Sequence, residues 1–183
     1  MTSVIRIFGI DPGSAATGWG VVDSAGPRLF YVASGVIRPK RGAGHAEKLC
    51  TIFEGLKALL AEHAPDEAAV EETFVNASPR DALVLGQARG VALLAPSLAG
   101  LSVAEYAANS VKKSVVGRGH ADKAQVAAMV KVLLPKCGDL ASDEADALAV
   151  AICHAHNRSV FQQSGSRFAP ENATNKKQKL EAS

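Results

Sequence analysis

The stretch that decides the fold is residues 5–22, IRIFGIDPGSAATGWGVV. A short apolar strand over residues 5–10 ends in a carboxylate, Asp11, and the chain then turns at Pro12-Gly13. Residues 17–22 predict a returning strand. A carboxylate at the end of a buried strand loses hydration, and a metal ion or a phosphate–metal complex usually compensates its charge. The alternative is that Asp11 only caps the turn through its side chain.

The rest of the pattern predicts an α/β domain. An antiparallel meander at the N-terminus is followed by alternating helices and strands. The predicted strands cover residues 4–10, 18–23, 29–37, 68–70 and 101–105. The predicted helices cover residues 45–63, 79–95, 121–134 and 143–157.

Composition indicates a single soluble domain. The chain has 183 residues, of which 48% are hydrophobic and 21% charged. It contains no apolar run of membrane-spanning length and no signal-peptide pattern, and its three scattered cysteines suit a reducing cytoplasm. We therefore expect a cytoplasmic protein with one domain over residues 1–158 and a disordered polar tail over residues 159–183.

The positive charge is concentrated in one segment. The whole chain carries a net charge of +2, whereas residues 105–136 alone carry +4. The basic residues of this segment are Lys112, Lys113, Arg118, Lys123, Lys131 and Lys136. A solvated helix face would explain such a run. The glycine-bracketed Gly117-Arg118-Gly119 instead favours a loop that lies against a phosphate backbone.

Four acidic residues suggest chemistry: Asp11, Glu71, Asp143 and Asp146. The last two are three residues apart, which places them side by side on one helix face. They could simply complement the helix dipole. The remainder of their helix is strongly apolar, however, which would draw this acidic first turn toward the interior. Clusters of buried acids bind hard divalent ions such as Mg²⁺, and a pair of ions ~4 Å apart supports phosphodiester hydrolysis.

Five segments together resemble one known family. They are GIDPGS, VEETF, LGQARGVA, VKKSVVGRGHADKAQV and SDEADALAVAI, in this order over about residues 4–156. The chain is identified by them as similar to the RuvC family of bacterial Holliday-junction resolvases, within the ribonuclease H-like superfamily. The resemblance implies a mixed five-stranded sheet flanked by helices. It also implies a magnesium-dependent endonuclease that resolves four-way DNA junctions by paired, symmetric cuts during recombination and DNA repair.

The resemblance also assigns roles to individual residues. The family's metal-binding acids fall on Asp11, Glu71, Asp143 and Asp146, with two Mg²⁺ ions per site expected and Mn²⁺ as a substitute. The family's lysines near the scissile phosphate fall on Lys112 and Lys123, and its aromatic residue that contacts junction bases falls on Phe74. With the basic segment, the expected DNA-binding residues are Phe74, Lys112, Lys113, Arg118 and Lys123. The expected partners are four-way junction DNA, the RuvA–RuvB branch-migration complex and a second copy of the chain, with no membrane.

The homodimer also has a basis in the sequence. Gly86 and Gly90 lie four residues apart on one face of the helix predicted over residues 79–95. Glycine destabilises a helix interior by about 1 kcal/mol, so this pair suggests the close approach of another backbone. That backbone could belong to a second copy or to the chain's own sheet.

Other classes of protein fit less well. An actin-like or sugar-kinase ATPase also begins with Gly-x-Asp-x-Gly, but its duplicated core needs roughly twice this length. The glycines at positions 9, 13, 18 and 20 lack the G-x-G-x-x-G spacing of a dinucleotide-binding fold. A pure DNA-binding module would have no use for four acids. A non-catalytic or RNA-processing member of the same superfamily stays open as an alternative.

Overall fold

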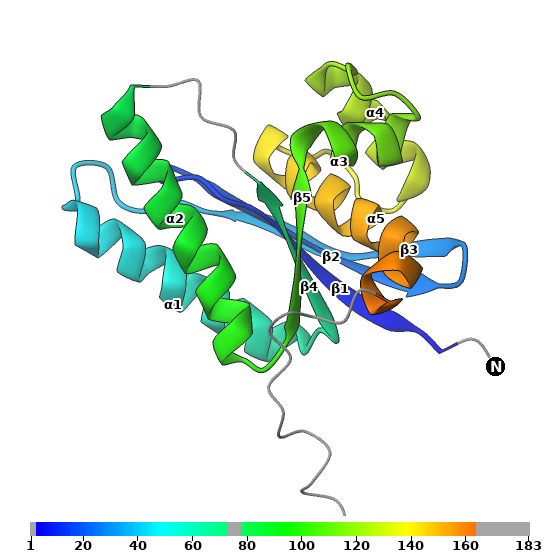
Figure 1. The fold of residues 1–183 in the computed structure, drawn as a ribbon, viewed down its shortest axis with the longest axis horizontal. Helices are drawn as coiled ribbons and strands as arrows, with labels where there is room; N and C mark the ends of the chain where they lie inside the picture. Colours follow the sequence, from blue (N-terminus) through cyan, green and yellow to red (C-terminus); the bar gives the residue numbers. More distant parts are fainter. Residues whose placement is uncertain (1–2, 73–77, 164–183) are drawn as a thin grey trace, which may run out of the picture.

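The structure, a computed structural model, describes residues 3–72 and 78–163. Its centre is a five-stranded sheet in the order β3-β2-β1-β4-β5 (Figure 1). The strands are β1 (Ile5–Asp11), β2 (Thr17–Ala25), β3 (Arg28–Ile37), β4 (Glu67–Glu72) and β5 (Ser102–Ala107). β1, β2 and β3 pair antiparallel, whereas β4 is parallel to both β1 and β5. The mixed five-stranded sheet expected from the sequence is confirmed.

Helices cover both faces of the sheet (Figure 1). One face carries α1 (His45–His63) and α2 (Pro79–Leu98), and the other carries α3 (Ala108–Val116), α4 (Lys123–Leu133) and α5 (Ser142–Gln163). Successive side chains of a strand point to opposite faces, so Ile7 joins the apolar cluster under α5 and Phe8 joins the cluster under α1 and α2. In the described part of the chain, no helix is both long and apolar enough to cross a membrane.

Helix α5 lies directly against β1 and β2 because the strand residues beneath it are glycines. A Cβ atom at Gly9 would overlap the carbonyl oxygen of Ala147, and one at Gly18 would overlap the carbonyl oxygen of Asp143. Gly20 makes a third such contact with α5. We call Gly9, Gly18 and Gly20 the glycine seam. It brings the first turns of α5 beside the end of β1, where the first candidate acid lies.

Helix α3 is absent from the elements expected from the sequence. The chain passes from β5 into α3 between Ala107 and Ala108, with no glycine or proline to mark the change. Ala107 is the N-cap and makes no side-chain capping bond, so no capping signal was available either. Lys112 and Lys113 lie on this helix, and the loop predicted at Gly117–Gly119 follows its last residue, Val116.

Helix α5 extends past its predicted end at residue 157 and past the domain boundary expected at residue 158. The helix continues to Gln163. Arg158 ties this last part to the sheet, since its Nε lies 2.9 Å from both carboxylate oxygens of Glu67 on β4. Residues 159–163 therefore belong to a helix rather than to a tail. The disorder predicted for the remaining residues, 164–183, falls outside the described part of the chain.

Candidate active site

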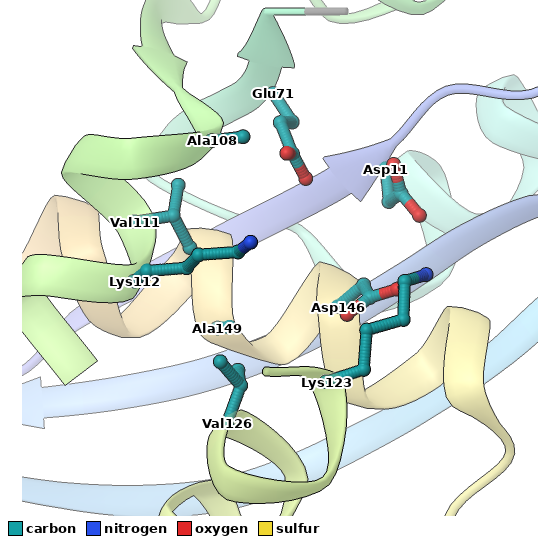
Figure 2. Close-up of a pocket in the computed structure, with 9 residues that line it drawn as sticks. All are labelled: Asp11, Glu71, Ala108, Val111, Lys112, Lys123, Val126, Asp146 and Ala149. Atoms are coloured by element: carbon teal, nitrogen blue, oxygen red, sulfur yellow. The ribbon is translucent and has the colours of Figure 1, made fainter. Parts of the chain in front are cut away.

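Three of the four predicted acids meet at one edge of the sheet. Ile10 of β1 pairs in parallel with Val70 of β4, so the residues that follow them, Asp11 and Glu71, leave neighbouring strands at the same level. Asp146 enters from α5, which the glycine seam holds close beneath β1. Figure 2 shows the three carboxylates turned toward a common space.

That space is a cavity of about 210 Å³, which we call the acid cavity. Lys112 of α3 and Lys123 of α4 reach into it from the side opposite the strands (Figure 2). Its remaining wall is apolar and comes from α3, α4 and α5. The complete lining is Asp11, Glu71, Ala108, Val111, Lys112, Lys123, Val126, Asp146 and Ala149.

Lys123 contacts one of the acids directly. Its Nζ donates a hydrogen bond to Oδ2 of Asp146 at 2.7 Å, and this bond raises the pKa of Lys123. Lys123 is the first residue of α4, which a capping box between Asp122 and Gln125 fixes in place. The ammonium group therefore partly neutralises the acid cavity from a defined position.

Burial and neighbouring carboxylates raise the pKa of two of these acids, Asp11 and Glu71. Burial, followed by the charge of Asp146, raises the pKa of Asp11 from 3.8 to about 7, while Lys123 acts in the opposite direction. Burial, followed by the charges of Asp11 and Asp146, raises the pKa of Glu71 from 4.5 to about 7. Desolvation and like charges both disfavour the charged carboxylate. Near neutral pH, Asp11 and Glu71 are therefore each partly protonated, and a bound cation would displace these protons.

The donor set fits a hard divalent cation. It consists of carboxylate oxygens, the ligands that Mg²⁺ takes in proteins. Burial first, and neighbouring carboxylates second, raise the pKa of Asp11 and Glu71, and a bound cation would offset both effects. In the conformation described for residues 3–72 and 78–163, no three Asp, Glu, His or Cys side chains are close enough together to surround an ion. The ammonium group of Lys123, paired with Asp146, places a positive charge beside the acids in this conformation.

Asp143 does not line the acid cavity, contrary to the expectation that all four acids converge. Oδ2 of Asp143 accepts a hydrogen bond from Nη2 of Arg38 at 3.2 Å, on the side of β3. Side chains three residues apart on a helix differ in direction by about 60°, so Asp143 and Asp146 can face different strands. The charge of Asp143 still contributes to the raised pKa of Asp11. Its role as a metal ligand stays a prediction.

The other predicted DNA-binding residues are spread around the acid cavity. Lys113 is exposed on the opposite side of α3 from the acid cavity and borders a separate hollow with His156. Arg118 is exposed in the loop between α3 and α4. Phe74 lies outside the described residues. Sequence reasoning missed Arg38, although it directly follows β3 and the antiparallel pairing of β1, β2 and β3 places that strand end at the edge that holds Asp11.

The fold and the acid cavity define a class of protein. A mixed sheet in this order, with acids at the ends of its central strand β1 and of the neighbouring β4 and a third acid on the helix beneath, is the ribonuclease H-like arrangement of a nuclease. A family model described as Crossover junction endodeoxyribonuclease RuvC matches residues 7–154. The chain belongs to the RuvC family and is an endodeoxyribonuclease.

Individual relatives are similar along most of their length. A RuvC from Methylocella silvestris is 59% identical over 156 residues, which span 85% of this chain and 89% of that protein. A RuvC from Azorhizobium caulinodans is 60% identical over 155 residues, or 85% of this chain and 92% of that protein. Both are named crossover junction endodeoxyribonuclease RuvC.

Solved structures give the same result. Thermus thermophilus RuvC in complex with a Holliday junction substrate matches with a TM-score of 0.78 and 32% identity, over 86% of this chain and 96% of that one. A yeast mitochondrial Holliday junction resolvase matches with a TM-score of 0.64 over 88% of this chain and 81% of that one. At 14% identity, this second likeness concerns the fold alone.

Proposed function

We propose that the chain resolves four-way (Holliday) DNA junctions by hydrolysing one phosphodiester bond in each of two strands, during recombination and DNA repair. The observation that carries the proposal is the acid cavity, in which three carboxylates face two lysines on a chain of the RuvC family. A protein that only bound DNA would gain nothing from burying Asp11 and Glu71 beside other carboxylates, where burial and the neighbouring negative charges raise the pKa of both.

The residues of the acid cavity divide into two groups. Asp11, Glu71 and Asp146 would hold Mg²⁺, with Asp143 joining after it leaves Arg38. A pair of such ions, or Mn²⁺ in their place, would supply an activated water and stabilise the leaving oxygen. Lys112 and Lys123 would bind the scissile phosphate and stabilise the charge that develops on it. Lys123 would have to leave Asp146 to reach that phosphate.

The working unit would be a two-fold symmetric homodimer, because two strands of like polarity must be cut. The exposed face of α2 supports this. Beyond the helix's own neighbouring backbone, a Cβ at Gly86 or Gly90 would meet no atom of residues 3–72 and 78–163 within 4 Å, so the chain's own sheet does not explain these glycines. The same helix exposes large apolar side chains, with Leu83 64% and Leu98 67% accessible. Burying such side chains favours association.

Further partners and the location follow from the family alone. We expect the protein to act in the cytoplasm on junctions that a RuvA–RuvB branch-migration complex prepares. Phe74 would stack on a junction base, and Lys113 and Arg118 would contact the backbone of the arms.

Cleavage of a labelled four-way junction tests the proposal, with linear duplex of the same sequence as the competing substrate. We expect nicks in the junction with Mg²⁺ and none in EDTA. The Asp146→Asn variant should lose at least ~100-fold in cleavage rate while it still binds the junction. Asp139→Asn is the matched control, since Asp139 is fully exposed and pairs only with the exposed Lys131 in the described structure. Equal cutting of duplex and junction, or an active Asp146→Asn variant, would contradict the proposal.

A further inference from the structure

A second group of positive charges lies at the same edge of the sheet as the acid cavity. Residues 38–41, Arg-Pro-Lys-Arg, follow β3, and we call them the basic turn. The amide of Ala43 donates to the carbonyl oxygen of Lys40 at 3.1 Å, and Gly42, directly after the basic turn, takes a φ of 83°. A left-handed φ at this position is readily available only to glycine. The basic turn therefore has a defined backbone shape.

The strand pairing fixes the position of the basic turn relative to the acids. Asp11 of β1 is paired with Gly18 of β2, which is paired with Val36 of β3. Arg38 follows two residues later and reaches Asp143 at the start of α5. Adjacent strands are ~4.8 Å apart, so β3 lies about 10 Å from β1 along this edge. In Figure 1 the connection between β3 and α1 lies at the far left, away from α3 and α4 at the upper right.

Positive charge therefore flanks the acids on both sides. Lys112 and Lys123 stand beside β4 and β1, and the basic turn stands beyond β2. The side chain of Arg38 is 58% accessible, and Lys40 and Arg41 are exposed. Within residues 3–72 and 78–163, neither Lys40 nor Arg41 forms an ion pair. Their charge is thus available to an outside anion.

We propose that the basic turn is a second phosphate-binding surface, which holds the nucleic-acid backbone on the side of the acid cavity opposite Lys112 and Lys123. One strand of DNA carries a phosphate for about every 3.4 Å of helix axis, so a span of about 10 Å corresponds to roughly three nucleotides. A strand whose scissile phosphate lies over the acid cavity would pass within reach of Lys40 and Arg41. The inference rests on the proposed function, because the distance to the basic turn is counted from the phosphate that is cleaved at the acid cavity.

An acidic protein partner is the competing occupant of the basic turn. Nucleic acid is favoured by position, since the basic turn shares a sheet edge with the acid cavity and contacts Asp143 through Arg38. Phosphate contacts also leave a specific signature in the salt dependence of binding.

The test is the salt dependence of junction binding in EDTA, where the DNA stays intact. Replacing Lys40→Ala and Arg41→Ala together removes two charges and leaves Arg38, with its contact to Asp143, in place. Each lost phosphate contact lowers the slope of log K against log salt by about 1. Between 50 and 200 mM salt, the wild type should therefore lose roughly 10–15-fold more affinity than the variant.

The matched control replaces one Arg and one Lys elsewhere, Arg28→Ala with Lys57→Ala. Arg28 starts β3 at the opposite end of the strand, and Lys57 is exposed on α1. Their salt slope should equal that of the wild type. If the basic-turn variant has the same salt slope as the control, the inference is overturned. If both variants still cut the junction in Mg²⁺, the proposed function stands. A lower slope in a protein that never cuts junctions would support phosphate binding by the basic turn and defeat the proposed function.

Discussion

Replacing Asp11 by Asn should stabilise the metal-free protein, by an amount that grows with pH. The pKa of Asp11 is 3.8 in the unfolded reference and about 7 in the native state. Between about pH 4 and pH 7, the native state therefore binds a proton at Asp11 that the unfolded state has lost. The free energy of unfolding falls as pH rises through this range and stays low above it. A difference of about 3 pH units corresponds to about 4 kcal/mol at pH 8.

The expected gain is smaller than this upper figure. An Asn amide in the same place is also partly desolvated, so we expect about 2–4 kcal/mol at pH 8, or a rise in Tm of roughly 5–10 °C for a chain of this size. At pH 5 the gain should be less than half as large. Removing the charge of Asp11 also lowers the pKa of Glu71, since Asp11 is one of the causes of its rise.

Thermal unfolding followed by circular dichroism in EDTA, at pH 5 and pH 8, measures both quantities. Asp139→Asn is the control and should show no such gain, because Asp139 is fully exposed and its pKa is lowered by Lys131 rather than raised. Adding Mg²⁺ should narrow the difference at pH 8, since only the wild type keeps the complete set of ligands. An Asp11→Asn variant that is no more stable than the wild type at pH 8, or equally more stable at both pH values, would refute the reasoning.

Three further variants test separate parts of the protein. Lys112→Ala should weaken junction binding in EDTA and lower the salt slope by about 1, and an unchanged slope would remove Lys112 from the phosphate contacts. Gly90→Leu should give a folded monomer by sedimentation equilibrium with a Tm close to that of the wild type, since no described atom outside the neighbouring helix backbone lies within 4 Å of the new Cβ. A dimer of wild-type affinity would place the interface elsewhere. Phe74→Ala should keep the Tm and reduce junction affinity by ~1–3 kcal/mol, whereas a lowered Tm with normal binding would identify a core residue.

Local sequence signals were enough for most of the fold. Strands end at turn residues. Helix α2 begins as expected, with Ser78 as the N-cap that accepts a hydrogen bond from the amide of Asp81 and with Pro79 at the first helical position. Helix α3 was missed because nothing in the sequence separates it from β5. The length of α5 was missed because its last turns are fixed by Arg158 and Glu67, which are 91 residues apart. Contacts over that separation leave no periodicity in the sequence.

The candidate site was predictable in its parts and less so in its geometry. Strand ends identified Asp11 and Glu71, and helical spacing identified Asp146. Spacing alone could not reveal that Asp143 faces Arg38, because the choice between the two directions depends on how α5 is rotated against the sheet. The raised pKa of Asp11 likewise depends on burial and on a charge from α5, which no local pattern encodes.

The glycine seam limits how this chain can change in evolution. A single nucleotide change converts a glycine codon to an alanine codon, so Gly18→Ala is one of the most accessible mutations. The added methyl group would overlap the α5 backbone at Asp143 and push the helix away from β2, although position 18 carries no chemistry. Asp146 belongs to the same helix, so its carboxylate would be displaced together with α5. Inactivating substitutions should therefore be as frequent at the glycine seam as at the acids, and a screen for loss of junction cleavage would recover both groups.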